Sequence, residues 1–211
     1  MKSFYSKILL FGEYGIIKNS KGLAIPYNFY KGTLKRKSQK QSELHHQKEE
    51  DILKSNEALR SFASYLQTLT EEESPIVQFD IQKLNADITA GMYFDSSIPQ
   101  GYGVGSSGAL VAAIYSEYAI NPINPNDNLT REKLLQLKAI FGRMESFFHG
   151  TSSGLDPLNS YLSLPILINS HDHIEPTGIP SQTPNGKGAV FLLDSGIIGE
   201  TAPMVRIFME N

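Results

Sequence analysis

The chain has 211 residues, no cysteine and a formal net charge of −3. This length is sufficient for one good core, or for one domain and part of another. The absence of cysteine excludes a disulfide framework, a thiolate metal site and a cysteine nucleophile, and it agrees with a reducing cytoplasm, where we expect the protein. The small negative charge argues against a general polyanion binder, so we expect no nucleic-acid partner, although residues 31–40 ("KGTLKRKSQK") are locally basic.

The N-terminal segment "MKSFYSKILLFGE" contains an apolar run of only five residues. Such a run is too short for a signal peptide or a membrane span, so we expect no membrane partner. Residues 7–11 read as a short buried strand, and residues 22–37 read as one or two more strands interrupted at Pro26. The sheet is therefore expected to begin at the N-terminus.

The middle of the chain alternates between polar connections and apolar periodic segments. Residues 39–61 predict an exposed loop that leads to an amphipathic helix over residues 56–69. The apolar positions of this helix are Leu59, Phe62, Ala63, Leu66 and Leu69. Residues 76–84 and 86–97 each read as a strand. The pattern therefore predicts a mixed α+β fold.

The second half of the chain contains two predicted helices and a late strand. The first helix extends from the glycine-rich segment to about Ile120, and the second begins after Thr130, which can cap it, and ends at Gly150. The breaker-rich segment "NPINPNDN" separates the two helices. Residues 188–196 ("GAVFLLDSG") predict a further strand.

The segment "PQGYGVGSSGA", residues 99–109, places alternating glycines and two serines directly before an apolar helix. Glycines allow positive φ angles and the close approach of another molecule, while a helix start leaves N–H groups free and exposes the positive end of its dipole. These properties suit an anion, so the segment predicts a phosphate-binding loop. A flexible turn before a core helix is the alternative that the glycines alone leave open.

Two charged residues lie on predicted apolar faces. Glu145 shares a helix face with Phe141 and Phe148, and a carboxylate there needs a cation, a metal ion or several donors unless it reaches water at the edge of the stripe. Lys7 shares a strand face with Leu9, so it needs an ion pair or a phosphate unless it extends to solvent. Both positions are candidates for a functional site.

A third segment, "HGTSSGLD", places Asp156 in the loop just beyond the helix that carries Glu145. The two carboxylates can therefore converge on one cleft. An aspartate before a proline is also a common way to start a turn, so a structural role stays open. The two histidines of the segment "HDH", at residues 171 and 173, lie in a Pro- and Gly-rich loop without a third ligand nearby in the sequence, which disfavours a zinc site.

Three segments of the chain resemble, in the same order, the three signatures of the GHMP kinases, and most of all those of mevalonate-type members. They are "SKILLFGEYG", "PQGYGVGSSGA" and "HGTSSGLD". The resemblance covers nearly the whole chain in motif order and spacing. It implies a GHMP-kinase N-terminal domain of the ribosomal-protein-like α/β type with a left-handed βαβ crossover. It also implies ATP- and Mg²⁺-dependent phosphorylation of a hydroxyl group on a small molecule, mevalonate first.

The resemblance also implies roles for individual residues. The nucleotide would be held by Ser96 and by the loop residues Gly101, Tyr102, Gly103, Val104, Gly105, Ser106 and Ser107. Ser107 and Glu145 would bind Mg²⁺, which prefers oxygen ligands. Asp156 would be the catalytic base, Lys7 the catalytic cation beside it, and Glu13 a substrate contact. Two alternatives to this function stay open: phosphorylation of another acceptor, such as phosphomevalonate or a sugar, and a non-catalytic truncated ligand-binding homologue. A homodimer also stays open.

The sequence departs from the family pattern at four positions: Ser6 for Gly, Tyr14 for His, Gly108 for Ala and Ser152 for Pro. Family members continue into a second domain with a third Gly-rich motif. We therefore expect residues 1–187 to be the nucleotide-binding domain. Residues 188–211 are expected to be the beginning of a truncated, ferredoxin-like C-terminal domain.

Overall fold

The computed structural model describes residues 2–37, 46–170, 172–178, 192–193, 196 and 201–210, with side chains left out at 46–48 and 201–204. The elements in chain order are β1 (Phe4–Phe11), η1 (Gly15–Lys18), β2 (Gly22–Arg36), α1 (His46–Thr70), α2 (Ile81–Thr89), β3 (Met92–Ser96), α3 (Ser106–Tyr118), α4 (Arg131–His149), α5 (Leu155–Leu162), β4 (Ile166–Ser170), β5 (His173–Pro176) and α6 (Thr201–Glu210). The fold is mixed α+β, as the sequence predicts.

The strands form one antiparallel sheet in which β2 is the central strand. Its order is β1-β2-β4-β5, and β3 also pairs with β2. Gly32 faces Phe4 of β1 and Ser96 of β3, while Ala24 faces Leu9 of β1 and Ile166 of β4. Thus β1 occupies one edge of β2, and β3 and β4 share the other edge at its two ends.

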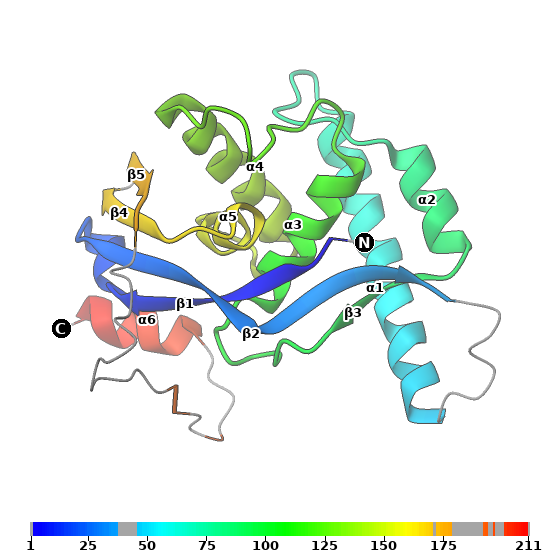
Figure 1. Cartoon of the computed structure of the whole chain (residues 1–211), viewed down its shortest axis with the longest axis horizontal. Coiled ribbons are helices and arrows are strands. Elements are labelled where there is room, and N and C mark those ends of the chain that lie inside the picture. The colour runs from blue at the N-terminus through cyan, green and yellow to red at the C-terminus, as the bar shows by residue number, and fades with distance from the viewer. Residues whose placement is uncertain are drawn as a thin grey trace.

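The helices bury an extended core against this sheet. Figure 1 shows α3, α4 and α5 on one side of β1 and β2, with α6 on the other side. In α3, Val111, Ala112 and Ile114 have no exposed surface, because this helix is surrounded by the sheet and by other helices. Among the described helices, none combines the length and hydropathy that a membrane span requires.

The N-terminal strands lie where the sequence predicts them, and β2 is one strand rather than two. The prediction that residues 7–11 are buried is wrong at the end of β1, where Leu10 and Phe11 are exposed. Pro26 lies opposite Lys7 within the ladder of β1 and β2. The irregularity lies beyond it, because Tyr5 pairs with Lys31 while Ser6 pairs with Tyr27. Three residues of β2 are therefore extra at this point, which makes a bulge.

Two predictions for the middle of the chain are wrong. The polar segment before residue 61 is not a loop throughout, because α1 begins at His46. Residues 76–84 are not a strand, because Asp80 caps α2 by accepting a hydrogen bond from the backbone N–H of Lys83. The helix cap therefore outweighs the alternating pattern. The only β-type pairing described in this segment is an isolated bridge between the buried Phe79 and Ala119. In the predicted strand 86–97, only β3 is extended.

The two later helices agree with their predicted ends. The helix α3 ends at Tyr118, and α4 begins after Thr130, whose side chain accepts a hydrogen bond from the N–H of Lys133. Gly150, at φ 73°, ends α4. The predicted strand at 188–196 lies mostly outside the described residues.

The C-terminal helix α6 lies against the turn after β1. The ring of Phe208 lies 5.7 Å from that of Tyr14, and the ammonium of Lys18 lies 4.9 Å from the centre of the Phe208 ring. The predicted domain boundary after residue 187 falls outside the described residues, so it stays a prediction.

Glycines bring the backbones of α3, α4 and α5 unusually close together. A Cβ on Gly108 would lie 2.8 Å from backbone atoms of Asp156 and Pro157. A Cβ on Gly154 would lie 2.1 Å from the carbonyl oxygen of Lys138 and 2.6 Å from the nitrogen of Gly142. Since real Cβ contacts are longer than this, only glycine allows the loop before α5 to approach both helices in this arrangement.

This close approach predicts that Gly108→Ala destabilises the protein, although alanine is the better helix former. We expect a loss of about 1–3 kcal/mol in the free energy of unfolding, because the new methyl group meets backbone that must move. Urea denaturation measures the loss. Gly178→Ala is the matched control, because its Cβ would meet no atom within 4 Å; equal stability of the two variants would contradict the prediction.

Candidate active site

The fold brings the predicted lysine and aspartate together. Lys7 lies on β1 and Asp156 lies in the first turn of α5, and Lys7 Nζ is 3.1 Å from Asp156 Oδ1. The Lys7 side chain is 9% exposed, whereas that of Asp156 is 35% exposed. Lys7 is therefore buried in an ion pair rather than extended to solvent, while the Asp156 carboxylate is still accessible to another molecule.

The glycine loop is attached to the same lysine. The backbone N–H of Lys7 donates a 3.0 Å hydrogen bond to the carbonyl of Val104. Gly105 has φ 83°, and a Cβ on it would lie 3.0 Å from Lys7 Cγ, so glycine also makes room for the lysine side chain. In contrast, a Cβ on Gly103 would meet no atom within 4 Å. The sequence predicts that the glycine loop leaves room for another molecule to approach, and this room lies on the Gly103 side of the loop.

The glycine loop leads directly into α3. Gly105 is the N-cap, so Ser106 and Ser107 are the first two helical residues. Backbone N–H groups in the first turn of a helix have no partner within the helix, and they lie at the positive end of its dipole. This geometry suits a phosphate group.

Glu145 on α4 is buried, with 3% of its surface exposed, and both of its carboxylate oxygens accept hydrogen bonds. The Ser107 hydroxyl donates to Oε1 over 3.0 Å, and the Ser152 hydroxyl donates to Oε2 over 2.5 Å. The alternative in which Glu145 reaches water at the edge of the helix is therefore wrong. Its donors are two hydroxyls, from α3 and from the loop before α5.

Burial raises the pKa of Glu145, and the negative charge of Asp156 raises it further. The hydroxyls of Ser152 and Ser107 and the charge of Lys7 oppose this shift. The two carboxylates thus share one nearby ammonium group, which leaves the cluster short of positive charge when both are ionised. A divalent cation would supply it.

Two residues that the sequence reasoning did not assign also belong to this cluster. His149 Nε2 lies 3.0 Å from Ser107 Oγ, so one hydroxyl contacts both Glu145 and His149. Ser152, which stands where the family motif has proline, supplies the second donor to Glu145. The signal for His149 was its position four residues after Glu145, which places both on one helix face.

Other predicted residues lie apart from this cluster. Glu13 is exposed in the turn after β1, because the strand ends at Phe11 and does not continue to it. Ser96 ends β3, and its hydroxyl accepts a hydrogen bond from the N–H of Ile98. Tyr102 is exposed, whereas Val104 is partly buried against the core.

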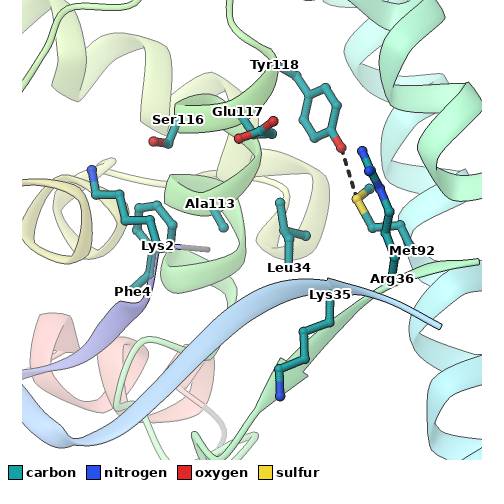
Figure 2. Close-up of a pocket in the computed structure, with 10 residues that line it drawn as sticks. All are labelled: Lys2, Phe4, Leu34, Lys35, Arg36, Met92, Ala113, Ser116, Glu117 and Tyr118. Atoms are coloured by element: carbon teal, nitrogen blue, oxygen red, sulfur yellow. Dashed lines mark hydrogen bonds between the residues drawn. The ribbon is translucent and has the colours of Figure 1, made fainter. Parts of the chain in front are cut away.

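Two pockets near the sheet do not include the Lys7, Asp156, Glu145 and Ser107 cluster. Figure 2 shows one, a cavity of about 90 Å³ between the start of β1, the end of β2 and the second half of α3. The other has a volume of about 550 Å³, and its lining includes Ser96. Among the side chains that Figure 2 labels, Tyr118 contacts the Met92 sulfur, and nothing there matches the predicted chemistry.

Ser107 and Glu145 have oxygen atoms of the kind that a phosphate-bound Mg²⁺ takes as protein ligands. Mg²⁺ binds through one or two protein oxygens and keeps waters and phosphate oxygens as its other ligands. Within the described part of the chain, no three His, Cys, Asp or Glu side chains gather as a metal site. Ser107 Oγ and Glu145 therefore fit a cation that is held jointly with a phosphate, not one enclosed by protein.

One family model matches part of the chain. Residues 63–163 match the family model described as the GHMP kinases N terminal domain. This segment contains the glycine loop, Ser107, Glu145 and Asp156, and the antiparallel α+β fold agrees with it. These residues are therefore the part of the chain that matches a GHMP kinase N-terminal domain. A search of curated proteins finds no match.

Several solved structures of mevalonate kinases are similar to the chain at low identity. The enzyme from Methanococcus jannaschii is 14% identical with a TM-score of 0.46, and the match covers 84% of this chain and 55% of that one. The L. major enzyme in complex with R-mevalonate is 17% identical with a TM-score of 0.46, over 99% and 60% of the two chains. The chain thus spans little more than half the length of these structures.

The raised pKa of Glu145 predicts a pH dependence of stability. A carboxyl whose pKa is higher in the folded state than its ordinary 4.5 binds protons more tightly when folded. Its contribution is therefore most favourable at low pH and declines as pH rises through the unfolded and then the folded pKa. Between about pH 5 and about pH 8 we expect this to lower the free energy of unfolding by about 1–3 kcal/mol.

Glu145→Gln should remove most of this decline, as measured by urea denaturation across that pH range. Glu57→Gln, at an exposed position on α1, is the control and should keep the wild-type slope. If Glu145→Gln and the wild type show the same slope, burial does not govern the protonation of Glu145.

Proposed function

We propose that the protein is an ATP- and Mg²⁺-dependent kinase that phosphorylates a hydroxyl group of a small molecule. The observation that carries this proposal is the convergence of Lys7, Asp156, Glu145 and Ser107 at the glycine loop of a GHMP kinase domain. The cluster combines an accessible carboxylate, a buried ammonium and oxygen ligands beside an anion-binding helix start. These are the groups that phosphoryl transfer to an alcohol requires.

The loop of residues 101–107 binds the triphosphate in this proposal. Backbone N–H groups at the start of α3 donate to phosphate oxygens, and the open side of Gly103 admits them. Ser96, Tyr102, Val104 and Ser106 are the further nucleotide contacts that the family resemblance implies. Mevalonate is the first acceptor to test, since the segments "SKILLFGEYG" and "HGTSSGLD" resemble those of mevalonate-type members.

Asp156 acts as the general base. Its partly exposed carboxylate accepts the proton of the acceptor hydroxyl as the oxygen attacks the terminal phosphorus. Lys7 holds this carboxylate in place and supplies positive charge where negative charge moves from the acceptor toward the leaving group. Glu13 is the acceptor contact that the family resemblance implies. Catalysis then consists mainly of placement and charge neutralisation.

Ser107 and Glu145 hold Mg²⁺ through the hydroxyl and carboxylate oxygens that lie 3.0 Å apart. When bound, the ion neutralises phosphate charge and orients the phosphate chain. The Ser152 hydroxyl keeps the second Glu145 oxygen in place, so the carboxylate plane is fixed before the ion arrives.

The experiment that tests this proposal compares wild type with Asp156→Asn in a coupled assay with ATP, Mg²⁺ and mevalonate. We expect turnover to fall by about 10²–10⁴-fold, because the base is lost, while ATP affinity changes by less than about threefold. Asp172→Asn, at an exposed turn residue, is the control and should keep wild-type turnover.

Near-normal turnover of Asp156→Asn would remove Asp156 from the mechanism. If the wild type binds ATP but phosphorylates neither mevalonate nor phosphomevalonate nor a sugar, the non-catalytic ligand-binding alternative is favoured instead.

The metal assignment predicts that Ser107→Ala and Glu145→Gln each raise the Mg²⁺ concentration needed for half-maximal activity by about tenfold, because each removes a ligand or its charge. Titration of activity with Mg²⁺ at saturating ATP measures this shift. Ser146→Ala is the matched control, because that hydroxyl donates to the Gly142 carbonyl within α4. An unchanged Mg²⁺ dependence in both variants would mean that the metal is held elsewhere.

A further inference from the structure

The last turn of α4 presents a carboxylate and an imidazole to the same hydroxyl group. Glu145 and His149 are four residues apart, so their side chains lie on one helix face. Ser107 Oγ lies 3.0 Å from Glu145 Oε1 and 3.0 Å from His149 Nε2. The three groups thus come from two helices, α3 and α4, and meet at one point.

These spacings are the ones that an octahedral ion requires of its neighbouring ligands. Two ligands at about 2.1 Å from an ion, at right angles to each other, lie about 3.0 Å apart. Ser107 Oγ therefore lies at the distance of a neighbouring ligand from both Glu145 Oε1 and His149 Nε2. Two helical ligands four residues apart are also a common way to hold a metal, because one helix fixes both.

We propose that His149 is a third protein ligand of the cation held by Ser107 and Glu145, and that the site consequently prefers a first-row transition ion such as Mn²⁺ or Co²⁺ to Mg²⁺. This inference rests on the cation site of the proposed function. An imidazole nitrogen binds transition ions more strongly than it binds Mg²⁺, which selects oxygen.

The surroundings of the three ligands agree with an exchangeable ion. His149 is exposed at the end of α4, so water and phosphate reach that side of the site. When both are ionised, Glu145 and Asp156 carry two negative charges beside the single ammonium of Lys7, and this excess attracts a cation. The remaining coordination positions belong to water or phosphate oxygens.

The two roles of His149 require different states of its ring. As a ligand, Nε2 carries no proton and gives its lone pair to the ion. As a hydrogen-bond partner only, Nε2–H donates to Ser107 Oγ, because the single Ser107 proton goes to Glu145. Magnetic coupling between a bound ion and the nitrogen nucleus distinguishes the two roles.

The test is pulsed electron paramagnetic resonance of the full chain loaded with Mn²⁺ alone, without nucleotide or acceptor. We expect ¹⁴N coupling in the wild type and its loss in His149→Gln, with Mn²⁺ affinity falling about tenfold and Mg²⁺ affinity changing less. His173→Gln, which changes an exposed histidine on β5, is the matched control and should keep the coupling. Circular dichroism shows that each variant is folded.

The proposal is overturned if the wild type binds no Mn²⁺, if bound Mn²⁺ shows no nitrogen coupling, or if the coupling persists in His149→Gln. Equal losses of Mg²⁺ and Mn²⁺ affinity without nitrogen coupling would assign His149 a positioning role through Ser107. The measurement uses no substrate, so it separates this inference from the proposed function. A protein that shows nitrogen coupling but no phosphoryl transfer would refute the proposed function alone. An active protein that shows no coupling would refute this inference alone.

Discussion

The geometry of the site depends on how closely the loop before α5 can approach α3 and α4. Gly108 and Gly154 lie where any Cβ would meet backbone atoms less than 3 Å away. This contact places Asp156 next to the start of α3 and Ser152 next to Glu145, and Lys7 then completes the cluster from β1. A larger residue at either glycine would push the loop before α5 away from the helix that it contacts.

Burial of Glu145 is the main electrostatic cost of this arrangement. A buried carboxylate is unfavourable unless donors or cations surround it, and here two hydroxyls and a nearby lysine compensate only in part. The folded protein therefore keeps a cluster of acidic groups in which a bound cation would offset the excess negative charge. Such strain at a site, kept in place by a well-packed scaffold, is typical of functional groups.

Much of this could be predicted from the sequence, but not all of it. The helices around Ser107 and Glu145 follow from their glycines, caps and apolar periodicity, and the motif order predicts the family. The pairing of Lys7 with Asp156 was implied only by the family resemblance, because residue spacing does not give it. The contact of Ser152 with Glu145 depends on a tertiary distance that neither the spacing nor the resemblance gives. The strand predicted at 76–84 failed because a single capping side chain, Asp80, outweighed an alternating pattern.

Lys7 contacts two parts of the site at once, with different atoms. Its backbone N–H holds the Val104 carbonyl of the glycine loop, while its side-chain ammonium holds Asp156 on α5. The glycine loop and Asp156 are thus connected through one residue of the edge strand β1. The position of the glycine loop and that of the Asp156 carboxylate therefore both depend on a single residue of β1, so a change at position 7 affects both.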